Sequence, residues 1–307
     1  MDLCNEKDIR ALLGRHGFRF SKSMGQNFLI EGWVPRDIAE ASGAGPDTGV
    51  LEIGPGIGPL TVQLARRAAK VAAIELDRTL YPILAETLAP YPNAEVVPGD
   101  AMKLDLAALV SDKFSGLTAI ACANLPYNIT TPVLTALIEA GCFASITVMI
   151  QREVALRICA APGSSDYGAF SVFCQYHTQP ELLFEVGPEC FLPAPKVTSA
   201  VIRLVPRSAP PQNLVDDSFF FQVVRASFAQ RRKTLLNGLS SAFGSRLSKD
   251  ARPPDCPPIS GASGWVSLNL PLWPPPSRTV SEPVYRAVFA NPTKRTCKNR
   301  PFLLQYS

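Results

Sequence analysis

A glycine-rich turn between a strand-like run and a helix-like run is the feature that most constrains this chain. The segment VLEIGPGIGPLT (50–61) places Gly54, Gly56 and Gly58 directly after a β-rich stretch. Glycine lets the backbone approach a ligand closely where a Cβ would collide. The pattern Gly-x-Gly-x-Gly is weakly specific by itself, because structural turns also produce it. Its meaning therefore depends on the segments that follow.

Short β-rich runs alternate with helix-like stretches over the first two thirds of the chain. The first five runs occupy 48–53, 70–75, 94–99, 117–124 and 145–151. This spacing predicts βαβ units, and therefore an α/β fold whose mainly parallel sheet has helices on both faces. Two further runs, 181–186 and 197–205, have no long helical segment between them. We expect them to form an antiparallel hairpin that brings the sheet to seven strands.

Two carboxylates follow the second and third of these runs. Glu75 ends KVAAIE, 21 residues after Gly54, and Asp100 follows AEVVPG. The first can accept both hydroxyl protons of a ribose, and the second can accept from an adenine amino group. The third glycine comes one residue too early for a dinucleotide motif, and Pro59 removes an N–H that a pyrophosphate would need. The combination favours S-adenosylmethionine over NAD, although either carboxylate alone is equally typical of a solvated surface.

The turn Asn124-Leu125-Pro126-Tyr127 follows the fourth run. An exocyclic adenine amine is a poor nucleophile because its lone pair is delocalised into the ring. The Asn124 side-chain oxygen and the Leu125 carbonyl can hold its hydrogens out of plane, with Pro126 fixing the turn. Tyr127 offers a face on which a base can stack for ~1–3 kcal/mol, and Phe191 offers a second wall. A packed tight turn and a core phenylalanine are the simpler alternatives.

The chain changes character after residue 205. Pro-rich, polar residues 206–217 predict a linker, and FFFQVVRASFAQRRKTLLNGL (219–239) predicts a basic helix. Its apolar face would carry Phe221, Val224, Phe228, Leu235 and Leu239. Its basic residues are Arg225, Arg231, Arg232 and Lys233. A solvated helix face is the alternative to an RNA-binding surface.

The segment 251–307 follows a different pattern again. It holds 11 of the 29 prolines and has no sustained helical or strand periodicity. Runs of proline cannot continue a helix and fit poorly in a sheet. We expect this segment to be poorly ordered.

Composition and residue usage exclude several classes of protein. A formal net charge of +4 is too small to identify a nucleic-acid binder. The eight cysteines occur singly and only two histidines are present, so we expect no metal site and free thiols in a reduced, cytoplasmic protein. The charged N-terminal residues lack the apolar core of a signal peptide. Residues 116–138 carry no charge, but asparagines and prolines interrupt them, so we expect no membrane span.

A series of segments resembles the ribosomal RNA adenine dimethylase family, most closely its bacterial small-subunit branch. They are FSKSMGQNFL (20–29), LEIGPGIGPLT (51–61), AIELD (73–77), GDAMKLD (99–105), ANLPYNI (123–129), FLPAPKVTSAVIRL (191–204) and RASFAQRRKTLLNGL (225–239). They lie in the family's order within residues 10–249, which makes the series very specific. The resemblance implies a Rossmann-like class I methyltransferase domain over 1–205 and a basic helical RNA-binding region over 206–250.

The resemblance also implies the cofactor and the site residues. S-adenosyl-L-methionine would contact Asn27, Leu29, Gly54, Gly56, Glu75, Asp100 and Asn124. The target adenine would be held by Asn124, Leu125, Pro126, Tyr127 and Phe191. The RNA would be engaged by Arg225, Arg231, Arg232 and Lys233. No metal is implied.

The activity implied is methyl transfer to N6 of two adjacent adenosines in the 3′-end hairpin loop of small-subunit rRNA, late in subunit assembly. We expect a monomer whose partner is the small-subunit rRNA. A large-subunit rRNA adenine methyltransferase and a non-catalytic RNA-binding assembly factor are the alternatives. The family pattern stops near Asp250, which leaves the small helical domain incomplete. Our hypothesis is that 251–307 is an altered reading frame or a divergent, atypical tail.

Overall fold

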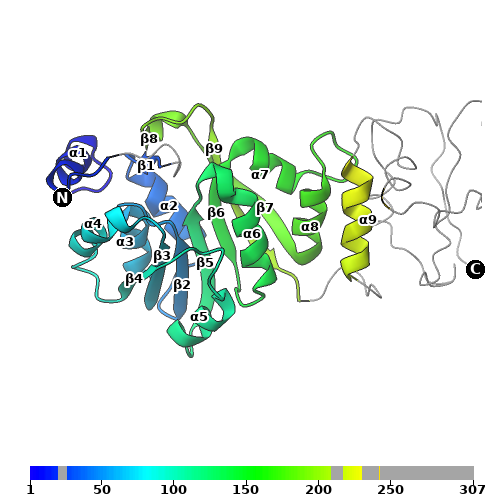
Figure 1. The fold of residues 1–307 in the computed structure, drawn as a ribbon, viewed down its shortest axis with the longest axis horizontal. Coiled ribbons are helices and arrows are strands. Elements are labelled where there is room, and N and C mark those ends of the chain that lie inside the picture. Colours follow the sequence, from blue (N-terminus) through cyan, green and yellow to red (C-terminus); the bar gives the residue numbers. More distant parts are fainter. Residues whose placement is uncertain (20–25, 209–216, 230–241, 243–307) are drawn as a thin grey trace, which may run out of the picture. The chain divides into compact units, whose positions relative to one another are not determined.

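A mainly parallel sheet of seven strands forms the body of the larger part of the chain (Figure 1). The computed structural model describes residues 1–19, 26–208, 217–229 and 242. The chain divides into two units, Met1–Cys159 with Cys174–Pro210, and Ala160–Phe173 with Pro211–Ser307. The sheet belongs to the first of these units.

The sheet has the order β4-β3-β2-β5-β6-β9-β7. Its strands are β2 (Thr48–Ile53), β3 (Lys70–Glu75), β4 (Ala94–Pro98), β5 (Thr118–Asn124), β6 (Ile146–Gln151), β7 (Thr178–Val186) and β9 (Ser199–Pro206). The first five are parallel, and β9 pairs antiparallel with both β6 and β7. Each predicted run overlaps one strand, so the predicted α/β fold with a seven-stranded sheet is confirmed.

Helices α2 (Trp33–Ala41) and α3 (Pro59–Ala65) pack against one face of this sheet. Ile38 of α2 and Leu64 of α3 share a buried apolar cluster with Val50, Ile120 and Met149 of the strands. The remaining helices of this unit are α1 (Glu6–Arg15), α4 (Tyr81–Thr87), α5 (Leu106–Lys113), α6 (Thr130–Glu139) and α7 (Arg152–Cys159). The uncharged residues 116–138 span the end of the connection from α5 to β5, then β5 itself, the turn after it and most of α6. Within the described helices, none is both long and apolar enough to cross a membrane.

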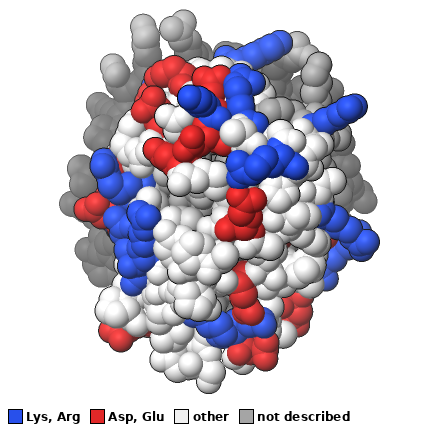
Figure 2. All heavy atoms as spheres, turned by 90° about the vertical axis from the view of Figure 1, so that its left-hand side faces the viewer, with Lys and Arg blue, Asp and Glu red and all other residues white. Residues whose placement is uncertain are grey.

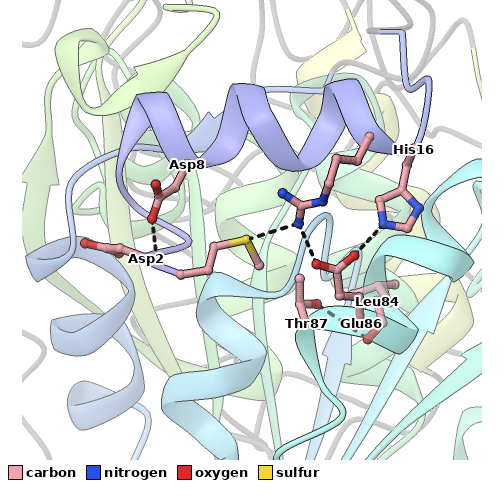
Figure 3. Close-up of polar contacts among 8 residues, drawn as sticks. Asp2, Asp8, His16, Leu84, Glu86 and Thr87 are labelled. Carbon is pink, nitrogen blue, oxygen red and sulfur yellow. Dashed lines mark hydrogen bonds and ion pairs between the residues drawn. The ribbon is translucent and has the colours of Figure 1, made fainter.

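Helix α1 packs on α4, a contact that the sequence did not predict. Ile9 and Leu12 of α1 are fully buried in an apolar cluster with Ile83 and Leu84 of α4. Figure 3 shows the polar contacts beside this cluster, where Glu86 accepts hydrogen bonds from Arg15 (2.5 Å) and His16 (2.7 Å). The hydrogen bonds from His16 and Arg15 lower the pKa of the Glu86 carboxyl. Because exposed ion pairs contribute little free energy, the apolar contacts hold α1 in place.

A separate two-stranded sheet joins the N-terminal segment to a distant loop. Strands β1 (Phe28–Leu29) and β8 (Phe191–Leu192) pair antiparallel, with Leu29 opposite Phe191. The backbone N–H of Ile30 donates to the Cys190 carbonyl at 2.9 Å and extends the pairing. This pairing places two of the predicted site residues beside each other.

The smaller unit is described by two helical segments. Residues 169–173 of α8 (Ala169–His177) and all of α9 (Asp217–Ala229) belong to it. The helix predicted from residue 219 is therefore present as far as Ala229, and Leu235 and Leu239 lie outside the described residues. Val224 is buried as predicted, whereas Phe221 and Phe228 are only half-buried. Their rings contact Phe173 and Tyr167, with centroids 5.6 Å and 6.3 Å apart.

A row of polar residues crosses the sheet on the face covered by α2 and α3. Glu52, Cys122, Thr147 and Arg203 are successive register partners on β2, β5, β6 and β9. Glu52 Oε2, Thr147 Oγ1 and Arg203 Nε have no hydrogen-bond partner among the described residues. Burial raises the pKa of Glu52 to about 8. Because a buried polar group without a hydrogen-bond partner is unfavourable, the stability of the sheet depends on whether Glu52 is charged.

Glu52→Gln should change how stability depends on pH. In the unfolded chain this carboxyl has its ordinary pKa of 4.5, whereas burial in the folded chain raises its pKa to about 8. The stability of the unsubstituted protein should therefore fall as pH rises from 4.5 to 8, by roughly 3–5 kcal/mol from this group. Urea unfolding at several pH values measures this slope, which the variant should lack. The exposed Glu40→Gln is the control, and equal slopes in Glu52→Gln and the unsubstituted protein would contradict the assignment.

The glycine turn after β2 adopts left-handed backbone conformations. Gly54, Gly56 and Gly58 have φ values of +68°, +62° and +94°. Gly58 is the residue that precedes α3, and Pro59 takes the first helical position. A Cβ on Gly58 would lie 3.2 Å from Thr87 Oγ1 and 3.3 Å from Leu88 Cδ2. Both the backbone conformation and the lack of space therefore require glycine here.

Gly58→Ala should destabilise the fold by about 1–3 kcal/mol, because an L-residue is strained at this φ and the new methyl group must displace α4 side chains. The midpoint of urea unfolding measures the loss. Gly45→Ala is the matched control, because its φ lies outside the left-handed region and its Cβ would meet nothing within 4 Å. Similar midpoints for the two variants would show that the turn tolerates a side chain.

Candidate active site

A cavity of about 340 Å³ opens where the parallel strands β2, β3, β4 and β5 end. Every residue predicted to bind the cofactor or to hold the target base lines it, namely Asn27, Leu29, Gly54, Gly56, Glu75, Asp100, Asn124, Leu125, Pro126, Tyr127 and Phe191. The carboxyl ends of parallel strands are where α/β sheets bind ligands. The structure therefore brings together residues that the sequence analysis selected on separate segments.

Glu75 ends β3 with a nearly buried side chain, 5% exposed. Its Oε1 accepts a hydrogen bond from the backbone N–H of Asp77 at 2.7 Å. Burial raises the pKa of this carboxyl, and backbone N–H groups of Asp77, Gly56 and Leu76 partly oppose the rise. The glycine turn is held against the same strand, because the Gly54 N–H donates to the Ile74 carbonyl at 2.9 Å. A carboxylate fixed in this way can receive a pair of vicinal hydroxyls.

Asp100 follows β4 and is partly exposed to the cavity. Its Oδ1 accepts from the Met102 backbone N–H at 3.0 Å. Leu76 and Met102 also line the cavity, with 54% and 43% of their side chains exposed. The sequence analysis did not select these two, although each follows closely after a strand-end carboxylate. Large apolar side chains left exposed in a cavity suit a flat, apolar ligand surface.

The N-terminal segment reaches the cavity through β1. The Gln26 Nε2 donates to Asp77 Oδ2 at 2.7 Å, and Asn27 and Leu29 line the cavity beside it. Because the Asp77 N–H donates to Glu75, Gln26 is connected to the Glu75 carboxylate through one residue. The sequence analysis missed Gln26, for which only its place in the segment FSKSMGQNFL was a signal.

The turn of residues 124–127 leaves the sheet at the end of β5. Asn124 lies opposite Met149 of β6, and the Leu125 N–H donates to the Met149 carbonyl at 3.1 Å. Leu125 is 1% exposed as a whole residue and is one of the residues that line the cavity. The Pro126 carbonyl accepts from Ile129 N–H at 3.2 Å and closes the short helix η3 (Tyr127–Ile129). The turn is therefore anchored at both ends.

Tyr127 and Phe191 form aromatic parts of the cavity wall. Tyr127 is half-buried, and its hydroxyl lies 2.7 Å from Ser199 Oγ, a residue that the sequence analysis did not select. Burial raises the pKa of the Tyr127 phenol. Phe191 is 3% exposed and belongs to the apolar cluster around α2 as well as to the cavity. The two interpretations of this phenylalanine, core residue and cavity wall, thus both apply.

The predicted RNA-binding residues are only partly described. Arg225 lies on α9 and is exposed, and Arg231, Arg232 and Lys233 lie outside the described residues. Figure 2 shows the face of the larger unit on the side of α1 and α4, where basic side chains are interspersed with acidic ones. No patch of a single sign covers this face, which agrees with the small net charge of the chain.

Over residues 1–19, 26–208 and 217–229, no three histidine, cysteine, aspartate or glutamate side chains form a group that could hold a metal ion. Six cysteines in these ranges are free thiols, and burial raises the pKa values of Cys122 and Cys174. Buried thiols with raised pKa values are poor nucleophiles, and neither of these two cysteines lines the cavity.

Comparison with known proteins identifies the family of this chain. The family model for ribosomal RNA adenine dimethylase matches residues 17–251, and the Pro-rich segment after residue 251 lies outside the match. The Ribosomal RNA small subunit methyltransferase A of Geobacillus sp. (strain WCH70) is 48% identical over 240 residues, covering 78% of this chain and 82% of that protein. The protein of the same name from Alkaliphilus metalliredigens (strain QYMF) is 48% identical over 242 residues, covering 78% and 84%.

Solved structures with the same fold include two RNA-modifying enzymes. The 23S rRNA methyltransferase ErmE is similar with a TM-score of 0.59 and 29% identity, over 72% of this chain and 86% of that chain. A dimethyladenosine transferase from Plasmodium falciparum is similar with a TM-score of 0.59 and 29% identity, over 69% and 74%. The fold, the motifs and these relatives agree, and the chain belongs to the ribosomal RNA adenine dimethylase family.

Proposed function

We propose that this protein transfers methyl groups from S-adenosyl-L-methionine to N6 of two adjacent adenosines in the 3′-end hairpin loop of small-subunit rRNA. The observation that carries the proposal is the single cavity shared by Glu75 and the turn of residues 124–127. The relatives named for the small subunit are 48% identical, whereas the large-subunit enzyme ErmE is 29% identical. This difference supports the small-subunit substrate over the large-subunit alternative.

The cofactor would lie along the strand ends of β2, β3 and β4. Glu75 would accept the two ribose hydroxyls, and Asp100 would accept from the adenine amino group. The side chains of Leu76 and Met102 would flank the adenine ring. Gly54 would lie under the methionine part, because a Cβ there would meet no protein atom within 4 Å and would instead project into ligand space. Asn27, Leu29 and Gly56 would complete the cofactor contacts.

The charges in the cavity support a nucleoside cofactor without phosphates. Two carboxylates, Glu75 and Asp100, line the cavity and would repel a pyrophosphate. Pro59 occupies the first position of α3, so this helix start lacks one of the N–H donors that dinucleotide sites use. A sulfonium carries positive charge, which this acidic cavity favours. NAD therefore fits the site poorly.

The groups that would hold the target adenine follow β5, the strand next to β2 and its glycine turn. The Asn124 side-chain oxygen and the Leu125 carbonyl would accept hydrogen bonds from the N6 amine and favour a more tetrahedral nitrogen. Tyr127 would stack on the base, with Phe191 as a second wall. When bound, the sulfonium supplies an already activated methyl group. The protein therefore contributes mainly position, so that the nitrogen lone pair meets the methyl carbon in line.

The completeness of the cavity argues against a protein that only binds RNA. A binding factor has no need for a buried carboxylate at β3 or for acceptors beside an adenine amine.

We propose that 1–205 is the catalytic domain and that Arg225, Arg231, Arg232 and Lys233 of 206–250 contact RNA. We further propose that 251–307 is an atypical tail and that the protein acts as a monomer in the cytoplasm. The family implies a methyl donor of the S-adenosylmethionine type and gives no role to a metal.

Glu75→Gln should weaken S-adenosylhomocysteine binding by about 10–100-fold, because charge-assisted hydrogen bonds to the ribose would be lost. Isothermal titration calorimetry measures the dissociation constant. Glu139→Gln is the matched control, because Glu139 is exposed at the end of α6 and does not line the cavity. Equal affinity in both variants would show that the nucleoside does not bind at the end of β3.

Asn124→Ala should lower methyl transfer by about 10²–10³-fold, because one of the two amine acceptors is removed. The assay supplies labelled S-adenosylmethionine and small subunits from a dimethylase-deficient strain, and the modified bases are mapped. Dimethyladenosine in the 3′-end hairpin, present with the unsubstituted protein and lost in the variant, is the expected result. Transfer to other bases, or undiminished transfer by Asn124→Ala with a normal melting temperature, would overturn the proposed function.

A further inference from the structure

A hydrogen bond ties the cavity tyrosine to the sheet. The Tyr127 hydroxyl and Ser199 Oγ lie 2.7 Å apart, and either oxygen can be the donor. Ser199 is fully buried at the first position of β9. It is a register partner of Gln151 on β6 and of Val186 on β7. Ser199 is therefore a rigid partner, because paired strands hold it on both sides.

This contact determines where the ring of Tyr127 lies. Tyr127 begins the single-turn helix η3, and short turns constrain a side chain less than a sheet does. Fixing the hydroxyl at one end and the Cα at the other removes the freedom of both side-chain torsions. Breaking this hydrogen bond costs free energy, because Ser199 has no access to water and an unpaired buried hydroxyl is unfavourable.

The loop that carries Phe191, the second aromatic residue of the cavity wall, is attached to the same strand, β9. Phe191 of β8 and Ser199 of β9 lie at the two ends of one short loop. The base of that loop is fixed by the Arg152 N–H, which donates to the Thr198 carbonyl at 3.0 Å. At the start of β9, the Ser199 side chain thus fixes Tyr127, and the Thr198 carbonyl fixes the loop of Phe191.

We infer that Ser199 is a positioning residue for methyl transfer, which holds Tyr127 so that a stacked adenine presents its amine to the methyl donor. The inference rests on the proposed function. Ser199 does not line the cavity and acts only through the tyrosine. The same bond directs the Tyr127 hydroxyl toward Ser199, which leaves the ring face to orient the base.

A double-mutant cycle tests this role. Ser199→Ala and Tyr127→Phe each remove the bond and keep the ring, and each should lower the single-turnover rate of methyl transfer at saturating RNA and cofactor by about 5–10-fold. The double variant should be no slower than the slower single variant, because both changes break one interaction. S-adenosylhomocysteine affinity should be unchanged in all three, since the bond lies outside the cofactor contacts.

Tyr91→Phe is the matched control. The Tyr91 hydroxyl accepts from Arg66 at 3.0 Å and 3.2 Å, away from the cavity, so its loss should leave the rate unchanged. Multiplicative losses in the double variant, or a normal rate in Ser199→Ala, would overturn this inference alone. If Ser199→Ala fails to fold, Tyr127→Phe decides, and a normal rate there overturns the inference. No transfer by the unsubstituted protein would overturn the proposed function and this inference together.

Discussion

Parallel pairing of β2 with β3 and β5, and of β3 with β4, is the constraint on which the site depends. Parallel strands direct their carboxyl ends to one edge of the sheet, and neighbouring strands lie about 4.8 Å apart. The glycine turn, Glu75, Asp100 and the turn of residues 124–127 each follow one of these strands. One cavity therefore gathers chemical groups from four separate segments.

Antiparallel pairing of β1 with β8 adds a further part of the cavity wall. Leu29 and Phe191 face each other across this small sheet, so cavity-lining residues from two distant segments share one backbone contact. The Gln26–Asp77 hydrogen bond attaches the same N-terminal segment to the end of β3. Ser199 attaches Tyr127 to β9. These long-range contacts fix the walls of the cavity.

Local patterns in the sequence were sufficient for the sheet and for Glu75, Asp100 and the turn of residues 124–127. The period of the apolar residues and the turn residues that follow them indicate structure within one segment. They therefore predicted that Glu75 and Asn124 each lie at the end of a strand. The packing of α1 on α4, the β1–β8 pairing and the Ser199 contact join distant segments, which periodicity does not report. Leu76 and Met102 were missed because an apolar residue beside a strand normally packs in a core. Their exposure became visible only in the folded chain.

The central claim is that one cavity holds the methyl donor along the ends of β2, β3 and β4 and leaves the turn of residues 124–127 for the base. A crystal structure with S-adenosylhomocysteine tests it most directly. The account predicts ribose hydroxyls within hydrogen-bond distance of the Glu75 carboxylate, adenine between Leu76 and Met102, and the thioether sulfur facing Asn124. A nucleoside bound elsewhere, or one that fills the space between Tyr127 and Phe191, would contradict the account.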